Sequence, residues 1–135
     1  MKLQVGVKVL ITQNDTYLFL RRSADFKAGP QKWDIPGGRI ESDEALEVAL
    51  AREVNEETGL QLTKVDRLLA AQDIFVPAAE IHVVRLTYTG QAKGDVTISD
   101  EHDDYRWMTR EEVLSEPHVD SYLKEVLPTL ESSNG

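Results

Sequence analysis

The chain has 135 residues, enough for one domain with a buried core, and we expect a single domain over residues 1–135. Its 15 basic and 24 acidic residues give a net charge of −9, which argues against duplex nucleic acid as a partner, because that ligand requires a broad basic surface. Cysteine is absent, which excludes disulfides, thiolate metal sites and cysteine nucleophiles. No stretch approaches the roughly 20 apolar residues of a membrane span and no signal-peptide pattern begins the chain, so we predict a cytoplasmic protein without a membrane partner.

The opening segment predicts a β-hairpin. Apolar and polar residues alternate over residues 5–11, a turn signal follows, and residues 17–21 are typical of a returning strand. Arg21 and Arg22 end this strand and lead into a loop that contains Gly and Pro. In a mostly acidic chain this pair is a candidate for binding a substrate phosphate, and a surface pair without function is the alternative.

A short strand and a glycine-rich turn are predicted next. Residues 33–35 are typical of the strand, and its Trp33 either packs in the core or stacks on a nucleobase. Pro36-Gly37-Gly38 is a turn with unusual backbone freedom. Gly37 and Gly38 would therefore let the main chain approach a metal ion or a phosphate closely, or would only connect the strand tightly to a helix.

A helix is predicted from about Asp43 to Thr58. Ser42 or Asp43 offers a side-chain oxygen for an N-cap, and Gly59 supplies a left-handed C-terminal stop. Glu44 falls on the first turn, where we assign it a structural or capping role. The inward stripe begins with apolar side chains and ends in carboxylates: Leu46, Ala49, Leu50, Glu53 and Glu57, with Glu56 near its edge.

The carboxylates of Glu53, Glu56 and Glu57 are unfavourable without a positive partner. They repel one another at i,i+3 and i,i+4 spacing, and they lie at the helix end where the dipole prefers cations. A hard divalent cation with oxygen ligands, Mg²⁺ or Mn²⁺, fits this demand best. Arg52 is the other candidate, because its guanidinium can pair a carboxylate and hold Glu53 or Glu56 in one orientation. A solvated acidic helix end is the alternative without function.

Residues Gly38 to Leu60 read Gly-x5-Glu-x7-Arg-Glu-Val-x-Glu-Glu-x-Gly-Leu, with every fixed position filled. This pattern resembles the Nudix box, the signature of the Nudix hydrolases, which use divalent metal to split a pyrophosphate linkage in a nucleoside diphosphate joined to another group. The resemblance implies the Nudix fold, an α/β/α sandwich with a mixed β-sheet. It also implies that the metal is held by several of the box's oxygen atoms: the Gly38 carbonyl and the carboxylates of Glu53, Glu56 and Glu57.

The second half of the chain predicts two long strands and an acidic loop. Residues 65–75 and 81–88 are rich in β-branched and apolar residues, and Pro77 ends the first strand. Residues 91–100, with several polar residues and Gly94, are expected to form a loop.

The acidic stretch after that loop precedes a further short strand. Tyr105 and Trp107 alternate with Arg106, which places Glu101 and His102 in the loop before the strand. Many Nudix hydrolases carry an acidic residue in such a loop as a metal ligand or general base, and by this resemblance Glu101 is the best match. His102 is a candidate for proton transfer by its type, although a solvated loop residue is the preferred interpretation.

Two helices are predicted at the C-terminal end. Thr109 and Glu112 form a capping-box pattern that predicts a short helix to about Ser115. Pro117 is expected to start the last helix, and residues 131–135 are expected to be a frayed tail. The apolar face of the last helix comprises Val119, Tyr122, Leu123, Val126 and Leu127.

The predicted function is metal-assisted hydrolysis of a pyrophosphate linkage in a small nucleotide. Glu53, Glu57 and Glu101 are alternative general bases. The preferred substrate is a nucleoside triphosphate, normal or oxidised, giving a monophosphate and pyrophosphate, whereas ADP-ribose or another nucleotide sugar is the second choice. A Nudix module that binds nucleotides without catalysis is the remaining alternative, and a homodimer is one possible assembly. The candidate residues are, for catalysis, Arg52, Glu53, Glu56, Glu57 and Glu101, and for substrate binding, Arg21, Arg22, Trp33, Gly37 and Gly38.

Overall fold

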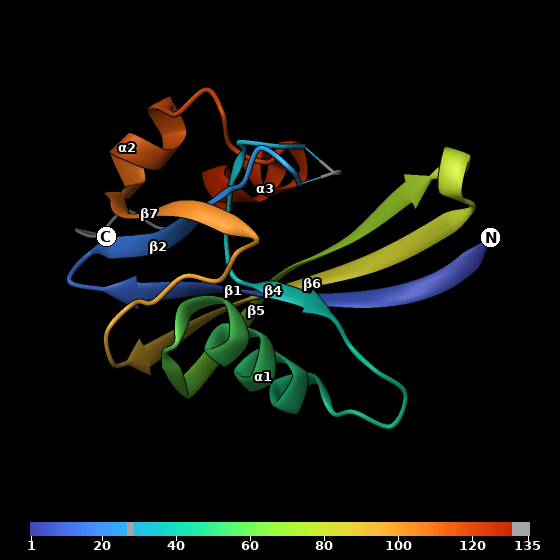
Figure 1. The fold of residues 1–135 in the computed structure, drawn as a ribbon, viewed down its shortest axis with the longest axis horizontal. Coiled ribbons are helices and arrows are strands. Elements are labelled where there is room, and N and C mark those ends of the chain that lie inside the picture. Colours follow the sequence, from blue (N-terminus) through green and yellow to red (C-terminus); the bar gives the residue numbers. More distant parts are fainter. Residues whose placement is uncertain (27–28, 131–135) are drawn as a thin grey trace.

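The computed structural model describes residues 1–26 and 29–130, which form a seven-stranded mixed β-sheet between helices (Figure 1). One helix covers one face of the sheet and two shorter helices cover the other, which confirms the predicted α/β class. In chain order the elements are β1 (Lys2–Gln13), β2 (Thr16–Arg22), β3 (Trp33–Asp34), β4 (Gly37–Arg39), α1 (Leu46–Thr58), β5 (Gln61–Val76), β6 (Ile81–Lys93), β7 (His102–Thr109), α2 (Arg110–Ser115) and α3 (Ser121–Val126), with 3₁₀ turns at Pro77–Ala79 and Leu127–Thr129.

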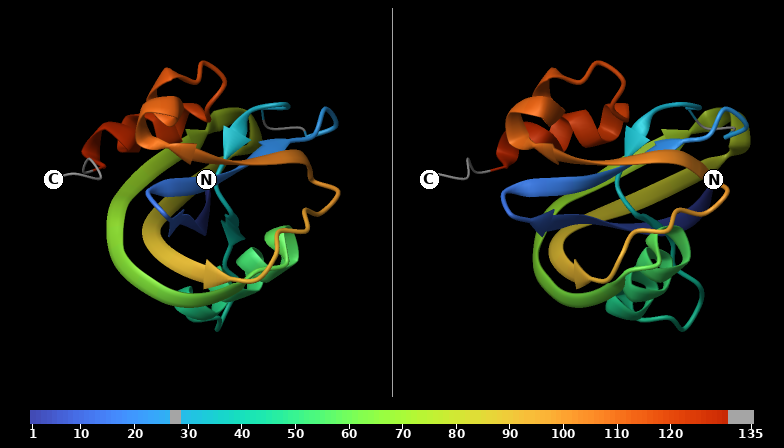
Figure 2. Two further views of the ribbon diagram at one scale, coloured as in Figure 1. Left: turned by 90° about the vertical axis from the view of Figure 1, so that its left-hand side faces the viewer. Right: turned by 60° about the vertical axis from the view of Figure 1, so that its left-hand side comes forward.

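Strand β1 is the centre of the sheet. The strand order is β3-β2-β1-β6-β5, while β4 pairs with β1 and β7 pairs with β2. Strands β1 and β6 run parallel from the pair Lys2–Ile81 to the pair Ile11–Gly90, and the other pairings are antiparallel. The long β5–β6 hairpin curves from the side of α1 to the side of α3 (Figure 2). Residues of β1 therefore lie beside the glycine-rich turn and beside the long hairpin at once.

Two hydrophobic clusters fill the space between the sheet and its helices. Alternate residues of β1 point to opposite faces, so Val7 and Val9 pack under α1 whereas Leu10 packs towards α2 and α3. The first cluster contains Val7, Val9, Ile11, Leu18, Leu20, Ala49, Leu50, Val54 and Leu60. The second contains Leu10, Phe19, Trp33, Ile35, Met108, Val113, Val119, Leu123, Leu127 and Leu130.

Helix α1 begins three residues later than the sequence indicates. The predicted N-cap at Ser42 or Asp43 is wrong, because Asp43 has a positive φ of 66° and the N-cap is Ala45, without a side-chain hydrogen bond. The Glu44 side chain folds back to accept the Glu41 N–H at 3.0 Å, which keeps these residues in a turn. The C-terminal stop is confirmed: Gly59 has a φ of 71° and donates to the Asn55 carbonyl.

Several other boundaries differ from expectation. Strands β5 and β6 extend beyond the predicted ranges, so the first part of the expected loop at 91–100 belongs to β6. Helix α3 starts at Ser121, capped by the Asp120 side chain, and the predicted start at Pro117 is wrong. The capping box of Thr109 and Glu112 is confirmed. The expected tail at 131–135 lies outside the described residues.

No helix in the described ranges 1–26 and 29–130 has the length and apolar character needed to cross a bilayer.

Candidate active site

The glycine-rich turn predicted at residues 36–38 differs in the structure, because Gly37 and Gly38 belong to the short strand β4 and pair with β1. This segment lies so close to β1 and to the C-terminal half of α1 that side chains are excluded. A Cβ atom on Gly38 would lie 2.6 Å from the Glu53 carboxyl group. Gly37 has a φ of 153°, and a Cβ atom there would lie 2.1 Å from the Val7 carbonyl oxygen. The Gly37 N–H donates to Glu57 Oε2 at 3.4 Å. Gly38 therefore allows the main chain to approach the Glu53 carboxylate, and Gly37 allows it to pack against β1. The predicted approach to a metal ion or a phosphate stays a prediction.

The three box carboxylates have different environments. Glu57 is buried, the Glu53 side chain is 15% exposed, and the Glu56 side chain is 57% exposed. Burial is the main cause that raises the pKa of Glu57 to about 9; the Lys8 ammonium opposes it, whereas the hydrogen bond that protonated Glu57 donates to Glu53 and the charge of Glu53 add to it. Glu53 and Glu57 thus form a hydrogen-bonded pair that a positive charge would stabilise in its ionised form.

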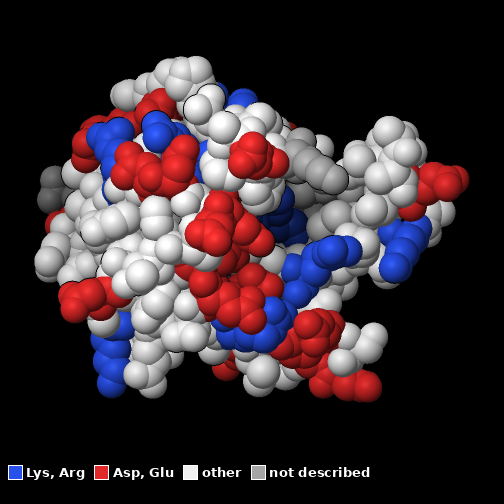
Figure 3. All heavy atoms as spheres, viewed as in Figure 1, with Lys and Arg blue, Asp and Glu red and all other residues white. Residues whose placement is uncertain are grey.

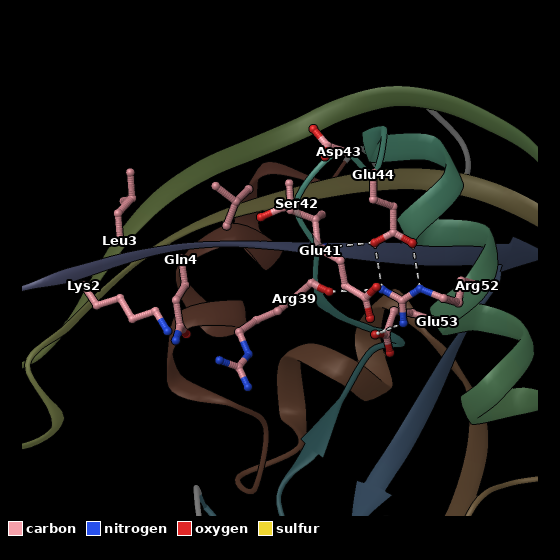
Figure 4. A pocket seen from close by; sticks show the side chains of 12 residues that line it. Lys2, Leu3, Gln4, Arg39, Glu41, Ser42, Asp43, Glu44, Arg52 and Glu53 are labelled. Carbon is pink, nitrogen blue, oxygen red and sulfur yellow. Dashed lines mark hydrogen bonds and ion pairs between the residues drawn. The ribbon is translucent and has the colours of Figure 1, made fainter.

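Arg52 links the start of the box to its end. Its guanidinium pairs with both oxygens of Glu44, at 2.7 and 2.9 Å, and also donates to Glu53 Oε1 at 2.9 Å (Figure 4). Its contact with Glu56 Oε2 is longer, at 3.5 Å. The hydrogen bonds from Arg52 are the main cause that lowers the pKa of Glu44 to about 2. Glu44 therefore has a structural role outside the helix, holding the arginine that orients Glu53.

A cleft of about 440 Å³ brings most of the candidate residues together. It lies between the box helix, the glycine-rich turn and the β5–β6 hairpin, where acidic side chains meet basic ones at a hollow in Figure 3. Its lining comprises Gln4, Gly6, Val7, Lys8, Arg22, Phe26, Asp34, Gly37, Gly38, Arg39, Glu53, Glu57, Val83, Arg85, Glu101 and His102. A larger hollow of about 640 Å³ shares Gln4, Arg39 and Glu53 with this cleft (Figure 4). It is not lined by Glu57, Gly37 or Gly38, so the smaller cleft is the candidate active site.

A buried ionic network forms the wall of the cleft opposite α1. Asp34 accepts hydrogen bonds from Lys8 Nζ at 2.8 Å and from Arg22. Asp120 accepts from Arg22 at 2.8 Å and from Arg85 at 3.2 Å. Burial by itself would raise the pKa of Asp34, but the charges of Lys8 and Arg22 outweigh it and hold that pKa well below its usual range. Of these five residues only Arg22 was a candidate from sequence.

Comparison with known proteins identifies the family. The family model described as NUDIX domain matches residues 2–130 of the chain. This chain belongs to the Nudix family. It is 33% identical over 111 residues to the nucleoside triphosphatase NudI of Enterobacter sp. (strain 638), covering 76% of this chain and 79% of that protein. It is 35% identical over 113 residues to the NudI protein of Salmonella agona, with coverage of 76% and 80%.

The fold agrees with solved Nudix structures. The crystal structure of a MutT protein from Methanosarcina mazei Go1 superposes with a TM-score of 0.83 at 29% identity, covering 94% of this chain and 91% of that one. The resemblance inferred from the box is therefore confirmed for the family and for the Nudix fold.

Two residues of this Nudix protein that were predicted to bind substrate, Arg21 and Trp33, do not line the cleft. Arg21 pairs with Asp103 at 2.7 Å and lies 5.8 Å from the centre of the Trp33 ring. Trp33 is 6% exposed and belongs to the core, and it borders a separate hollow together with Arg21. Arg21 borders that separate hollow whereas Arg22 lines the cleft, so the two arginines do not face one ligand together.

The candidate residues of the acidic loop have different positions. Glu101 is exposed at the rim of the cleft, and its carbonyl accepts the Ser23 N–H at 2.9 Å. His102 is the first residue of β7 and is 8% exposed, so the preferred interpretation as a solvated loop residue is wrong. Burial is the main cause that lowers the pKa of His102 to about 4, and its Nδ1 has no hydrogen-bond partner among the described residues.

The oxygen donors of the candidate site suit a divalent metal ion. Among the described residues no three acidic or histidine side chains converge as a ready-made metal cluster, and Glu56 is turned towards Arg52. Glu53 and Glu57, however, offer carboxylate oxygens on the cleft surface beside the Gly38 main chain. Hard divalent cations prefer oxygen ligands and would stabilise both carboxylates in their ionised form. Nudix hydrolases generally need such ions, and this donor set fits them.

Proposed function

We propose that this Nudix pyrophosphohydrolase cleaves nucleoside triphosphates, normal or oxidised, to a nucleoside monophosphate and pyrophosphate with Mg²⁺ or Mn²⁺. The observation that carries the proposal is the Glu53–Glu57 carboxylate pair, which lies against a glycine-rich turn and faces a cationic wall across one cleft. The choice of a triphosphate is supported by the two relatives named nucleoside triphosphatase.

The reaction is a hydrolysis at phosphorus. A water oxygen bonds to one phosphorus of the pyrophosphate linkage, and the bond from that phosphorus to the bridging oxygen breaks. The bridging oxygen leaves with the other phosphorus, so one water is consumed and one proton is released. The metal ion, when bound, neutralises phosphate charge and lowers the pKa of water.

Several residues of the chain have separate roles in this reaction. Glu57 and Glu53 would hold the metal, with Glu56 and the Gly38 carbonyl as further ligands. Arg52 fixes the orientation of Glu53 through its hydrogen bond at 2.9 Å. Glu53, Glu57 and Glu101 all line the cleft and are the candidates for accepting the proton of the attacking water. Arg22 lines the same cleft and contributes positive charge to its wall.

An apolar hollow of about 350 Å³ adjoins the cleft and suits the nucleoside part of a substrate. Ile74, Val76, Val83 and Tyr122 line it. It shares Arg22, Val83 and Arg85 with the cleft. This hollow would accept the nucleoside of a triphosphate or of a nucleotide sugar, so ADP-ribose hydrolysis is the second candidate function.

The test is a substrate panel with two matched variants. Release of monophosphate and pyrophosphate is measured with Mg²⁺ and with Mn²⁺ for nucleoside triphosphates, their oxidised forms, ADP-ribose and nucleotide sugars. We expect triphosphates to be preferred, with kcat reduced about 100-fold or more in Glu57→Gln. Glu111→Gln, which changes an exposed carboxylate of α2, is expected to match the wild type. Preference for ADP-ribose would replace the triphosphate proposal, and activity that survives Glu57→Gln would refute the assigned metal site.

A further inference from the structure

Lys8 is a partly buried cation that the assigned roles do not use. It lies in the middle of β1 on the same face as Leu10, and its side chain is 15% exposed. Burying an ammonium group and ordering a long flexible side chain are both unfavourable. An apolar residue would satisfy the core on this face, as the fully buried Leu10 does two residues later. Packing therefore does not explain why a lysine occupies this position.

Two hydrogen bonds fix the Lys8 ammonium in position, and its third N–H group is available to a ligand. Nζ donates to Asp34 Oδ2 at 2.8 Å and to the Ile35 carbonyl at 3.2 Å. The aliphatic stem passes Gly37 so closely that a Cβ atom there would lie 2.9 Å from Lys8 Cδ. An ammonium carries three N–H groups, and no acceptor for the third is found in the described part of the chain. The side chain lines the cleft, so a ligand in the cleft can take the third bond.

The wall around Lys8 carries more positive than negative charge. Lys8, Arg22 and Arg85 share the two carboxylates of Asp34 and Asp120, which leaves one positive charge in excess. Asp34 also retains the pair with Arg22 without Lys8, so neutralising Asp34 does not require the lysine. The carboxylates of Glu53 and Glu57, which line the same cleft, partly offset this excess charge, and an anion bound beside Lys8 would stabilise it further.

We propose that Lys8 is a phosphate ligand, donating its third N–H to a non-bridging oxygen of the substrate's pyrophosphate group. The anion would lie between Lys8 and the carboxylates of Glu53 and Glu57, which line the same cleft and hold the metal. A phosphate oxygen is a strong acceptor for an ammonium donor, and a fixed donor loses little entropy on binding. This inference rests on the proposed function for the identity of the substrate, but the predicted contact is to the pyrophosphate group alone.

The test measures binding of imidodiphosphate, a pyrophosphate analogue that resists hydrolysis, by isothermal titration calorimetry with Mg²⁺ present. Lys8→Met removes the charge and keeps the length of the side chain, and we expect the Kd of the analogue to rise about 10- to 100-fold. The Kd of Mg²⁺ without the analogue is expected not to rise, because the substitution removes a cation near its ligands. Lys93→Met, at the exposed end of β6, is expected to bind like the wild type.

A double variant separates the position of the ammonium from the charge of the wall. Lys8→Met with Asp34→Asn keeps one excess positive charge in the network, and we expect weak binding as in the single variant. Binding restored in the double variant, unchanged binding in Lys8→Met, a parallel loss of Mg²⁺ affinity, or no binding by the wild type would each overturn the proposal. Binding that depends on Lys8 without hydrolysis of any triphosphate would instead refute the proposed function and leave the phosphate site intact.

Discussion

Two arginine–carboxylate systems border the cleft, and they are built in different ways. The system around Arg52 joins residues 44–56 of one segment and is half-exposed. The system around Arg22 joins β1, β2, β3, β6 and the cap of α3, and its carboxylates are buried. Burial makes an ion pair costly to break, because the remaining partner is left without water or counter-charge. We therefore expect the Arg22 system to determine stability and the Arg52 system to determine the geometry of catalysis.

Asp34→Asn should give the largest effect. It removes the carboxylate that two buried cations share, and we expect the free energy of unfolding to fall by about 3–5 kcal/mol. Urea unfolding at pH 7 measures this change. Asp103→Asn, which removes the half-exposed partner of Arg21, is the control and should leave the unfolding midpoint nearly unchanged. Equal losses in both variants would mean that burial does not distinguish the two kinds of pair.

The dependence of stability on pH tests the same carboxylate. The pKa of Asp34 is lowered in the folded protein relative to its usual 3.8, so its ionised form stabilises the fold above that value. This contribution is expected to be complete at pH 6–7 and to be lost progressively as the pH falls below 3.8. The difference in unfolding free energy between wild type and Asp34→Asn should therefore shrink on acidification. A difference that grows towards low pH would contradict the assigned ion pairs.

Glu44→Gln should affect the geometry of the active site more than the stability of the fold. It removes the carboxylate charge that pairs with Arg52 at 2.7 Å, so the guanidinium is held less firmly and Glu53 is oriented less firmly. We expect kcat to fall about 10-fold, with a smaller decrease in the melting temperature than Asp34→Asn causes. Steady-state kinetics and thermal unfolding of the same preparation measure both quantities. A kcat equal to that of the wild type in Glu44→Gln would show that Arg52 orients Glu53 without help from Glu44.

Arg21→Gln should have the smallest effect. The Arg21 side chain pairs with Asp103 outside the cleft, so we expect kcat/KM to stay within about 2-fold of the wild type. Arg22→Gln, one residue along the chain, is expected to lower kcat/KM strongly, because Arg22 lines the cleft and holds both buried carboxylates. Equal effects of the two substitutions would restore the prediction that the arginines act as a pair.

The same contrast explains what the sequence could predict. The box carboxylates and the Gly59 stop depend on neighbours within about one helix length, so spacing alone indicates them. Gly37 and Gly38 instead lie in β4, whose pairing with β1 spacing does not report. Lys8, Asp34, Arg85 and Asp120 meet only through sheet pairing and the placement of α3, which spacing does not report. A single lysine in an apolar strand was the available signal for Lys8. The early start predicted for α1 failed because Glu44 bonds to Arg52 instead of continuing the helix.

The parallel pairing of β1 with β6 also constrains how the protein folds. The pair Lys2–Ile81 joins positions about 80 residues apart, and closing so long a loop is entropically unfavourable before other contacts exist. The β5–β6 hairpin and α1 depend on local contacts and are expected to form early. During synthesis β1 leaves the ribosome first, but its apolar residues have no parallel partner until β6 emerges. The β1–β2 hairpin is local, so it is the parallel edge of β1 that is expected to be among the last contacts to form.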